Sequence, residues 1–496
     1  MMGRGASWQL AAIAIIIGFT ASVPASAEQS ATPPQPKHAE TKSFDDLVEQ
    51  ALGTDPRAAI HKLDAMLAQL SGKEERGFFL ALRGAANIGI GKIDAASRDF
   101  DESRQLAPDD GVADNLRLIA GLVHKRYDQS SIALDQLLAG RTANVLAIDR
   151  PIMGEYLSNK KVSQEKLDDQ RIELAKLYYG GADGVLIRLR AVRTLVSRGR
   201  RPEAIALVPK VDEVDVLQSA LIDRRLESLW PNFEQSAGAH MATLITRNVT
   251  EAQAAFAERP SKADYRRRLM TALAAARRVP EALQRGAEIG QTPKALASLD
   301  EEDAWVVNDH AFALFRAGKW SDADRRFADL IQANTEKPWI VNMVINRVEL
   351  LARVGNYVEA DKLLGSAEPF GKAFGSPFAQ QLIRRIKLCT AVGLKQTALV
   401  QRLLAELKAH IKDSTTATVE GLLCAGDAAA AEKVVLEQLA DADTASTSVA
   451  LLQSAPLTPY DPSLWAEAWP SLRQRPAVEA AFQKAGRDLP DLYHIK

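Results

Sequence analysis

Residue types that carry chemistry are scarce or scattered in this chain. Its 496 residues include 2 cysteines and 7 histidines, and no two histidines stand at the HxxxH or HExxH spacing of a metal site. The chain also has no GxxxxGK[ST] phosphate loop, no GxGxxG turn and no GxSxG nucleophile elbow. We therefore expect no catalytic residues, no cofactor and no metal ion, and we expect that the protein is not an enzyme.

An excess of charge of either sign is also missing. Lys and Arg together number 62 and Asp and Glu 63, which leaves a net charge of -1. A nucleic-acid-binding protein needs a basic surface, so this balance argues against a nucleic-acid partner. Aromatic residues make up only 6% of a chain that is 47% hydrophobic. The hydrophobic residues are largely Ala and Leu, which favour helices over sheets, so we predict an all-α chain.

Only the N-terminus holds a long apolar run. Arg4 precedes the apolar residues 10–19, and Ala25-Ser26-Ala27 follows as a small-x-small cleavage site. This order predicts a signal peptide over residues 1–27 with cleavage after Ala27. An uncleaved anchor is the alternative, although the run is short for a membrane span. We expect a periplasmic or secreted mature chain without a transmembrane segment, beginning with a disordered polar linker over residues 28–42.

A helix–turn–helix unit recurs along the rest of the chain. Residues 80–108 read as two short helices joined at Gly91-Lys92. The second helix carries Ile93, Ala96, Phe100 and Leu106. A shift of 34 residues brings Lys125, Ser130, Leu134 and Thr142 to the places of Gly91, Ala96, Phe100 and Pro108. Further turns are expected at Gly199, Arg278, Gly318, Gly355, Gly393 and Gly426. This period is typical of a helical repeat array.

The unit resembles the tetratricopeptide repeat (TPR) family. The resemblance is carried by Arg83-Gly84, Gly91, Ala96, Asp99-Phe100 and Pro108. Small residues at 84 and 96 let the two helices approach closely, and Phe100 fills the gap between them. The resemblance implies repeats stacked into a right-handed superhelix, an α-solenoid, over most of residues 44–439. Asp114 and Arg266 depart from it, because an apolar residue is usual at their positions.

These patterns divide the chain after the linker into four parts. We expect N-terminal TPR-like repeats over 43–141, divergent helical repeats with an inserted loop over 142–260, C-terminal TPR-like repeats over 261–440 and a C-terminal helical cap over 441–496. The inserted loop is expected at 142–169, followed by a helix from about Ser163 to Tyr179. The cap should begin with a loop over 445–461.

The cap has an apolar set of its own. Its members are Trp465, Trp469, Leu472, Val478 and Phe482. An array exposes apolar surface on its last repeat unless something covers it, so we expect this set to cover that surface. The alternative is an aromatic patch that binds a partner.

The two cysteines, Cys389 and Cys424, fall in the first helices of neighbouring repeats. An exported compartment permits a disulfide between them. Two separate buried thiols that act as small hydrophobes are the favoured interpretation. The sequence leaves both open.

A candidate binding face follows from the resemblance. In the TPR family the first helix of each pair lines a concave groove that contacts an extended peptide. By register this face would hold Arg267, Arg268, Trp305, Asn308, Phe312, Arg316, Asn342, Asn346, Arg353, Arg384 and Lys387. Asn amides pair with a peptide backbone, and Arg forks onto a carboxylate. The hypothesis is a groove for an extended peptide, acidic or C-terminal, and the alternative is a solvated helix face without a ligand.

The function that we expect is a non-catalytic scaffold of the cell envelope. Its partner would be a protein or peptide of an envelope complex, as the resemblance implies. The alternative is an accessory or glycan-binding protein that assists envelope polysaccharide or cell-wall machinery. Trp305, Trp320 and Trp339 are the candidate exposed aromatics for that role, although the turn position of Trp320 favours packing in the core.

Overall fold

The computed structural model describes residues 47–108, 111–140, 142–146, 148, 150–179, 184–238, 241–337, 339–374, 376–442, 444–454, 457 and 468–494. The expected signal peptide, the linker at 28–42 and Trp465 lie outside the described residues. No helix in the described ranges is both long enough and apolar enough to cross a membrane.

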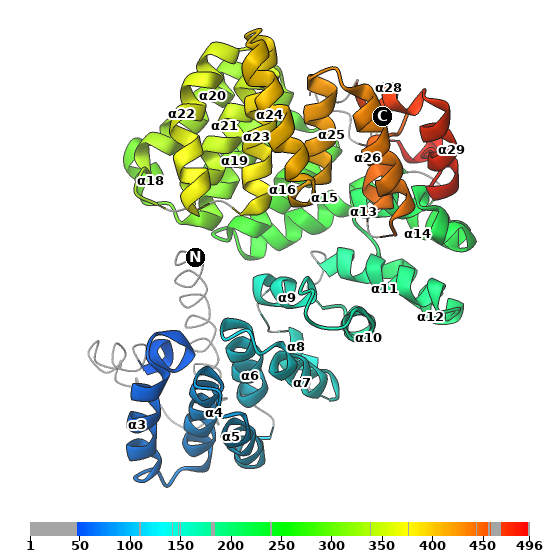
Figure 1. The fold of residues 1–496 in the computed structure, drawn as a ribbon. Coiled ribbons are helices and arrows are strands. Elements are labelled where there is room, and N and C mark those ends of the chain that lie inside the picture. Colours follow the sequence, from blue (N-terminus) through cyan, green and yellow to red (C-terminus); the bar gives the residue numbers. More distant parts are fainter. Residues whose placement is uncertain are drawn as a thin grey trace. The chain divides into compact units, whose positions relative to one another are not determined.

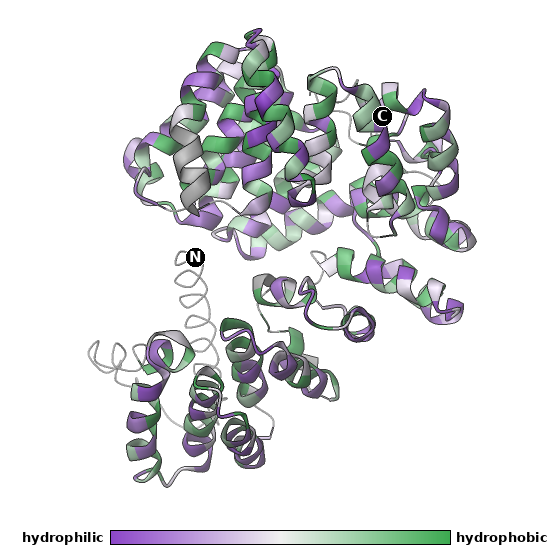
Figure 2. Cartoon of the chain, viewed as in Figure 1, coloured by the Kyte–Doolittle hydropathy of each residue, from purple (hydrophilic) through white to green (hydrophobic). Residues whose placement is uncertain are grey.

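All regular secondary structure in these ranges is helical, as the composition predicts. The chain divides into two compact units between Lys210 and Val211, within the stretch 142–260 that the sequence assigns to divergent repeats. In Figure 2, apolar and polar residues alternate along individual helices of both units, as amphipathic helices require.

Unit 1 contains the helices that precede this boundary. They are η1 (Gln50–Thr54), α3 (Pro56–Leu67), α4 (Lys73–Gly89), α5 (Ile93–Leu106), α6 (Val112–Val123), α7 (Tyr127–Leu138), α8 (Thr142–Leu146), α9 (Arg150–Leu157), α10 (Gln164–Lys176), α11 (Val185–Ser197), α12 (Arg201–Leu207) and η3 (Val208–Lys210) (Figure 1).

Unit 2 contains the rest. Its first half holds α13 (Val214–Ile222), η4 (Arg224–Leu229), α14 (Trp230–Ala237), α15 (Met241–Glu258), α16 (Ala263–Ala275), α17 (Val279–Ala287), α18 (Pro293–Ala297), α19 (Glu301–Arg316) and α20 (Trp320–Ala333). Its second half holds α21 (Ile340–Arg353), α22 (Tyr357–Phe374), α23 (Pro377–Gly393), α24 (Thr397–Ala409), η5 (Ile411–Asp413), α25 (Thr415–Cys424), α26 (Ala428–Ala440), α27 (Ala445–Leu451), α28 (Ala468–Arg473), α29 (Pro476–Ala485) and η6 (Asp491–Tyr493).

One turn geometry joins most of the helical hairpins. At Gly91 the backbone is left-handed, with φ 77°. The Lys92 N–H donates to the Asn87 carbonyl at 2.9 Å, which closes the end of α4. The same left-handed conformation, followed by the same closing hydrogen bond, occurs at Lys125, Gly199, Arg277, Gly318, Gly355, Lys395 and Gly426. Each turn leads directly into the second helix of its pair.

One of the expected turn glycines is misplaced. Gly393 is the last residue of α23, and the left-handed residue is Lys395, with φ 57°. Gly393 has another role, because a Cβ there would lie 2.3 Å from the ring of Tyr357. The prediction of a turn at Gly393 is therefore wrong. The glycine instead lets the ring of Tyr357 pack closely against the end of α23.

The packing inside the first hairpin agrees with the sequence. A Cβ at Gly84 would lie 3.0 Å from two ring atoms of Phe100. Phe100 and Ala96 are fully buried. The small residue therefore permits the close approach of α4 and α5 that the sequence predicts.

The two charged departures from the repeat pattern are neutralised in place. Asp114 is fully buried and accepts a hydrogen bond from Arg104 Nη1 at 2.8 Å. Arg266 forms an ion pair with Glu288 and lies over the ring of Phe256, 4.8 Å from its centroid. A buried charge is tolerated where it is paired, which explains how these positions carry charge.

The inserted loop is partly helical. Its residues form α8, α9 and the start of α10, so the loop prediction is wrong over 142–146 and 150–157. Tyr156 is fully buried and its hydroxyl donates to Gln170 Oε1 at 2.7 Å, which ties α9 to α10. The helix expected from Ser163 is confirmed: the Ser163 Oγ accepts from the Lys166 N–H, and the helix ends at Lys176.

The C-terminal segment joins the two ends of unit 2. Its loop prediction is wrong over 445–451, which form α27. Helix α29 packs against α26 (Figure 1). It also packs against η4, which lies at the opposite end of the unit's sequence from α26. The described members of the apolar set, Trp469, Leu472, Val478 and Phe482, are all buried. They therefore cover the last hairpin with apolar packing.

Candidate functional site

The candidate binding residues lie on α16, α19, α21 and α23, the first helices of four hairpins in unit 2. Several of them belong to two sets of hydrogen bonds and ion pairs, one that joins α16, α19 and α21 and one that joins α21, α23 and α25. We call the two sets together the polar seam. Its members are Arg267, Asn308, Asp309, Asn346, Glu349, Arg353, Arg385 and Glu420.

The first half of the seam spans α16, α19 and α21. Arg267 Nε donates to Asp309 Oδ2 at 2.7 Å, and Asn308 Nδ2 donates to the other oxygen of Asp309 at 3.0 Å. Asn346 Nδ2 in turn donates to Asn308 Oδ1 at 2.7 Å. The Arg267 guanidinium also lies 5.8 Å from the ring centroid of Trp305. The structure thus brings together four of the residues that the register predicts.

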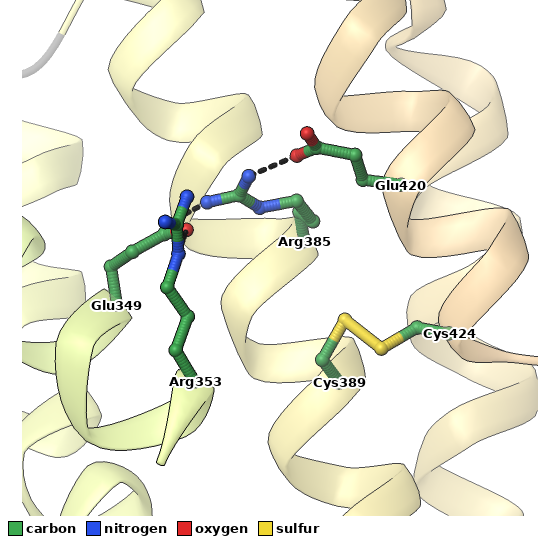
Figure 3. Close-up of a disulfide and its surroundings, with 6 residues drawn as sticks. All are labelled: Glu349, Arg353, Arg385, Cys389, Glu420 and Cys424. Atoms are coloured by element: carbon green, nitrogen blue, oxygen red, sulfur yellow. Dashed lines mark hydrogen bonds and ion pairs between the residues drawn. A yellow bond between two sulfur atoms is a disulfide. The ribbon is translucent and has the colours of Figure 1, made fainter. Parts of the chain in front are cut away.

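The second half spans α21, α23 and α25. Arg353 Nε donates to Glu349 Oε1 at 2.8 Å. Arg385 forms ion pairs with both Glu349 and Glu420, so that one guanidinium lies between two carboxylates (Figure 3). All three members of this triad are buried, and their charges are compensated within the chain.

Other candidates lie beside the seam rather than in it. Arg268 faces Glu213 and Glu251, at 3.4 and 3.7 Å. Arg384 Nη1 donates to Gln381 Oε1 at 3.0 Å and pairs with Asp413 at 3.3 Å. Lys387 is half-buried on the same helix. Arg268 and Arg384 are therefore paired with carboxylates of neighbouring elements.

The remaining candidates are Phe312, Asn342 and Arg316, of which only Arg316 is exposed. Phe312 is half-buried, with its ring edge-on to Phe327 at a centroid distance of 5.7 Å. Asn342 is half-buried, and Arg316 is exposed at the end of α19. No ion pair of Arg316 occurs among the described residues. Arg316 is thus the candidate cation with most freedom to meet a ligand.

Sequence reasoning missed the carboxylates of the seam and Arg385. Two signals could have pointed to them. Glu349 and Arg353 stand four residues apart on one helix, a spacing that favours an ion pair. Arg385 and Glu420 stand 35 residues apart, which is also the separation of Cys389 and Cys424.

The two cysteines are bonded to each other. The disulfide joins α23 to α25, with the Cα atoms 5.5 Å apart (Figure 3). The favoured interpretation as separate buried thiols is therefore wrong. First helices of neighbouring hairpins pack side by side, and equal positions on them face each other.

The tryptophans differ from expectation at one position. Trp320 is 52% exposed as the first residue of α20, so the expectation of core packing is wrong. By turn register Trp320 corresponds to Tyr357, which packs over Gly393 at the end of the next first helix. The position of α21 that corresponds to Gly393 is Arg353, and its side chain leaves no such space for an aromatic ring. Trp305 and Trp339 are half-buried.

Unit 1 contains a hollow of about 480 Å³ between α7, α10 and α12. Gln170, Asp135 and Asp169 are among its lining residues. Asp135 pairs with Lys166 and Asp169 with Arg198. These lining carboxylates are thus compensated by the chain itself, and in the described ranges no three His, Cys, Asp or Glu side chains converge as metal ligands would.

No protein-family model matches the chain, and no curated protein matches it significantly.

Proposed function

We propose that the protein is a non-catalytic interaction scaffold that binds an extended peptide along the first helices of unit 2. The observation that carries the proposal is the hydrogen bond between Asn308 and Asn346, which joins two first helices through their amides. A hydrogen-bonded Asn amide keeps further donor and acceptor capacity. Asn308 is buried and Asn346 is half-buried, so a peptide backbone laid across α19 and α21 would use the remaining capacity of Asn346.

The recurring turn supports a TPR-like arrangement. The same left-handed closing residue ends the first helix of successive hairpins, from Gly91 to Gly426. Small residues at the helix contacts, as at Gly84, match the family's pattern. We propose on this basis that the hairpins stack into a right-handed superhelix with the first helices on its concave side.

The ion pairs of the candidate arginines narrow down the kind of peptide that this face would bind. Arg267, Arg353 and Arg384 each have a carboxylate of this chain as a partner. Only Arg316 among the candidate arginines is exposed without such a pair in the described ranges. The peptide would therefore be recognised mainly through its backbone, with one carboxylate on Arg316.

An exported location fits the same proposal. The sequence begins with the three parts of a signal peptide, and Cys389 is bonded to Cys424. Disulfides persist in oxidising compartments such as the periplasm. The exported protein should begin at Glu28, and the intact mass of the purified chain checks this. A mass that includes residues 1–27 would instead indicate an uncleaved anchor.

In-cell photo-crosslinking tests the binding face. A photoreactive residue at Asn346 should give one dominant adduct with an envelope protein, and Arg316→Glu should abolish it. Arg325 on α20 is 70% exposed in its side chain and serves as the matched control position and substitution. Identical adducts from positions 346 and 325, or an adduct at 346 that persists in Arg316→Glu, would contradict the proposal.

A second candidate function is glycan binding, which the exposed indole of Trp320 favours. Sugar rings stack on exposed aromatic faces, and Trp320 is the most exposed of the described tryptophans. Cell-wall fragments should then quench the tryptophan fluorescence of the wild type but not that of Trp320→Phe. Equal quenching in both proteins would argue against this role.

A further inference from the structure

Two cross-links join the same pair of helices one turn apart. The disulfide connects Cys389 of α23 to Cys424 of α25, and an ion pair connects Arg385 to Glu420 on the same two helices. The partners are separated by 35 residues in both cases. Residues four apart lie above one another on a helix, so the two links form successive rungs between α23 and α25, as Figure 3 shows.

The ion pair between Arg385 and Glu420 is also part of the polar seam. Arg385 also pairs with Glu349 of α21, whose other oxygen accepts from Arg353. Arg385, Glu349 and Glu420 are only 4%, 9% and 8% exposed. Buried charges are stable only where good geometry offsets their desolvation. Only the Arg385–Glu420 pair depends directly on the distance between α23 and α25. A change in that distance would act on Arg385 and, through their shared partner Glu349, on Arg353.

The two cysteines differ in their exposure to solvent. Cys389 is 4% exposed, whereas Cys424 is half-buried at the last residue of α25. A dithiol reductant would attack Sγ of Cys424 through its thiolate, and Cys389 would leave as a thiolate that takes up a proton. The second thiol then displaces Cys424, so that the reductant becomes a cyclic disulfide and the protein gains two electrons and two protons.

We propose that the Cys389–Cys424 bond is a redox-sensitive clamp on the polar seam. In the disulfide state it holds Arg385 between Glu349 and Glu420, and Arg385 in turn orients the Glu349 carboxylate that accepts from Arg353. In the dithiol state the Gln381–Thr418 hydrogen bond still joins the start of α25 to α23, but the C-terminal part of α25 moves away from α23, Arg385 loses Glu420, and the second half of the seam loses its fixed geometry. The proposal rests on the proposed function in one respect only, because it takes the polar seam as the binding face.

The first test measures coupling between the two rungs. Glu420→Gln is compared with the wild type by urea unfolding of the full mature chain, in the disulfide state and after reduction with dithiothreitol. The substitution should lower the folding equilibrium constant about tenfold in the disulfide state and less than about threefold in the dithiol state. Equal effects in the two states would overturn the proposal.

Asp324→Asn is the matched control. Asp324 of α20 accepts from Arg347 Nε of α21 at 2.7 Å, so this pair also joins two helices but lies away from α23 and α25. Its loss should have the same effect in both redox states. The double variant Cys389→Ala/Cys424→Ala should reproduce the dithiol state without any reductant.

Amide hydrogen exchange provides the second test. Reduction should lower protection at least about tenfold in α25 and in the facing part of α23, while α19 and α20 keep theirs. Uniform loss of protection through unit 2 would mean a general staple and would overturn the clamp. Neither measurement needs a partner, so a failed clamp leaves the crosslinking test of the binding face standing, and a failed crosslink leaves the clamp standing.

Discussion

The guanidinium of Arg487 lies over the indole of Trp230, with its carbon 3.5 Å from the ring centroid. The same side chain donates to the Leu221 carbonyl at 2.7 Å and pairs with Glu234 at 3.1 Å. The C-terminal segment thus contacts α13 and α14, which lie at the N-terminal end of unit 2. A solenoid whose ends are free unfolds by increments, whereas this contact makes the two ends of unit 2 depend on each other.

Arg487→Ala should therefore destabilise unit 2 far more than an ordinary surface substitution. Loss of the cation–π contact and of charged hydrogen bonds should lower the free energy of unfolding by about 2–3 kcal/mol. Urea unfolding followed by tryptophan fluorescence measures this. Arg325→Ala, at an exposed side chain of α20, should change it by less than about 0.5 kcal/mol. A similar small change for both variants would show that the contact is dispensable.

Gly84→Ala should destabilise unit 1, because its new Cβ would lie 3.0 Å from the Phe100 ring in a filled core. We expect a loss of about 1–3 kcal/mol from this overpacking. Gly154 of α9 is the control, since a Cβ there meets no other atom within 4 Å. Gly154→Ala should raise the stability by up to about 1 kcal/mol through helix propensity. Thermal unfolding of the two variants tests the opposite signs, and a stabilised Gly84→Ala would contradict the packing argument.

His310 should make unit 2 less stable in acid. Its burial, assisted by the charge of Arg326, lowers its pKa from 6.5 to about 4. Between these values the unfolded chain binds a proton that the folded chain does not. The stability from neutral His310 is therefore complete above pH 6.5 and is lost as the pH falls toward 4, by up to about 3 kcal/mol at roughly 1.4 kcal/mol per pKa unit.

The measurement is the free energy of unfolding against pH for the wild type and for His310→Leu. The slope between pH 6.5 and 4 should be shallower in the variant. The prediction fails if His310→Leu and the wild type have parallel curves.

Trp320 should matter little for stability in spite of its size. Trp320→Ala removes a half-solvated ring and should cost less than about 1 kcal/mol. Phe327→Ala, on the same helix, removes a fully buried ring and should cost about 3–5 kcal/mol. Denaturant midpoints of the two variants measure the contrast. A large loss for Trp320→Ala would restore the core position that the turn pattern suggests.

The positions of many candidate residues could be predicted by register, but the partners that neutralise their charges could not. Asn308 and Asn346 were placed on neighbouring first helices, and they do meet there. The sequence also suggested free arginines for a carboxylate. The partner of Arg267 is Asp309, 42 residues away, and such a partner shows only when the helices are packed.

What the sequence by itself determined is local. Helix periodicity, the Gly91 turn and the small residue facing Phe100 follow from contacts within one hairpin, and each has a short-range signal. The failure at Gly393 is also local, because Lys395 supplies the left-handed turn residue. The failure at 150–157 has a longer-range cause, since α9 is held to α10 by the contact of Tyr156 with Gln170.

Only the tertiary structure decided which distant residues meet. The Cys389–Cys424 bond and the Arg385 triad join different helices, and the contact of Arg487 with Trp230 joins the segment after α29 to α14. The physical reason is that periodicity tells which side of a helix faces other helices, but not which neighbour it faces. That choice depends on the packing of the whole unit, where a buried charge is stable only with its partner in place.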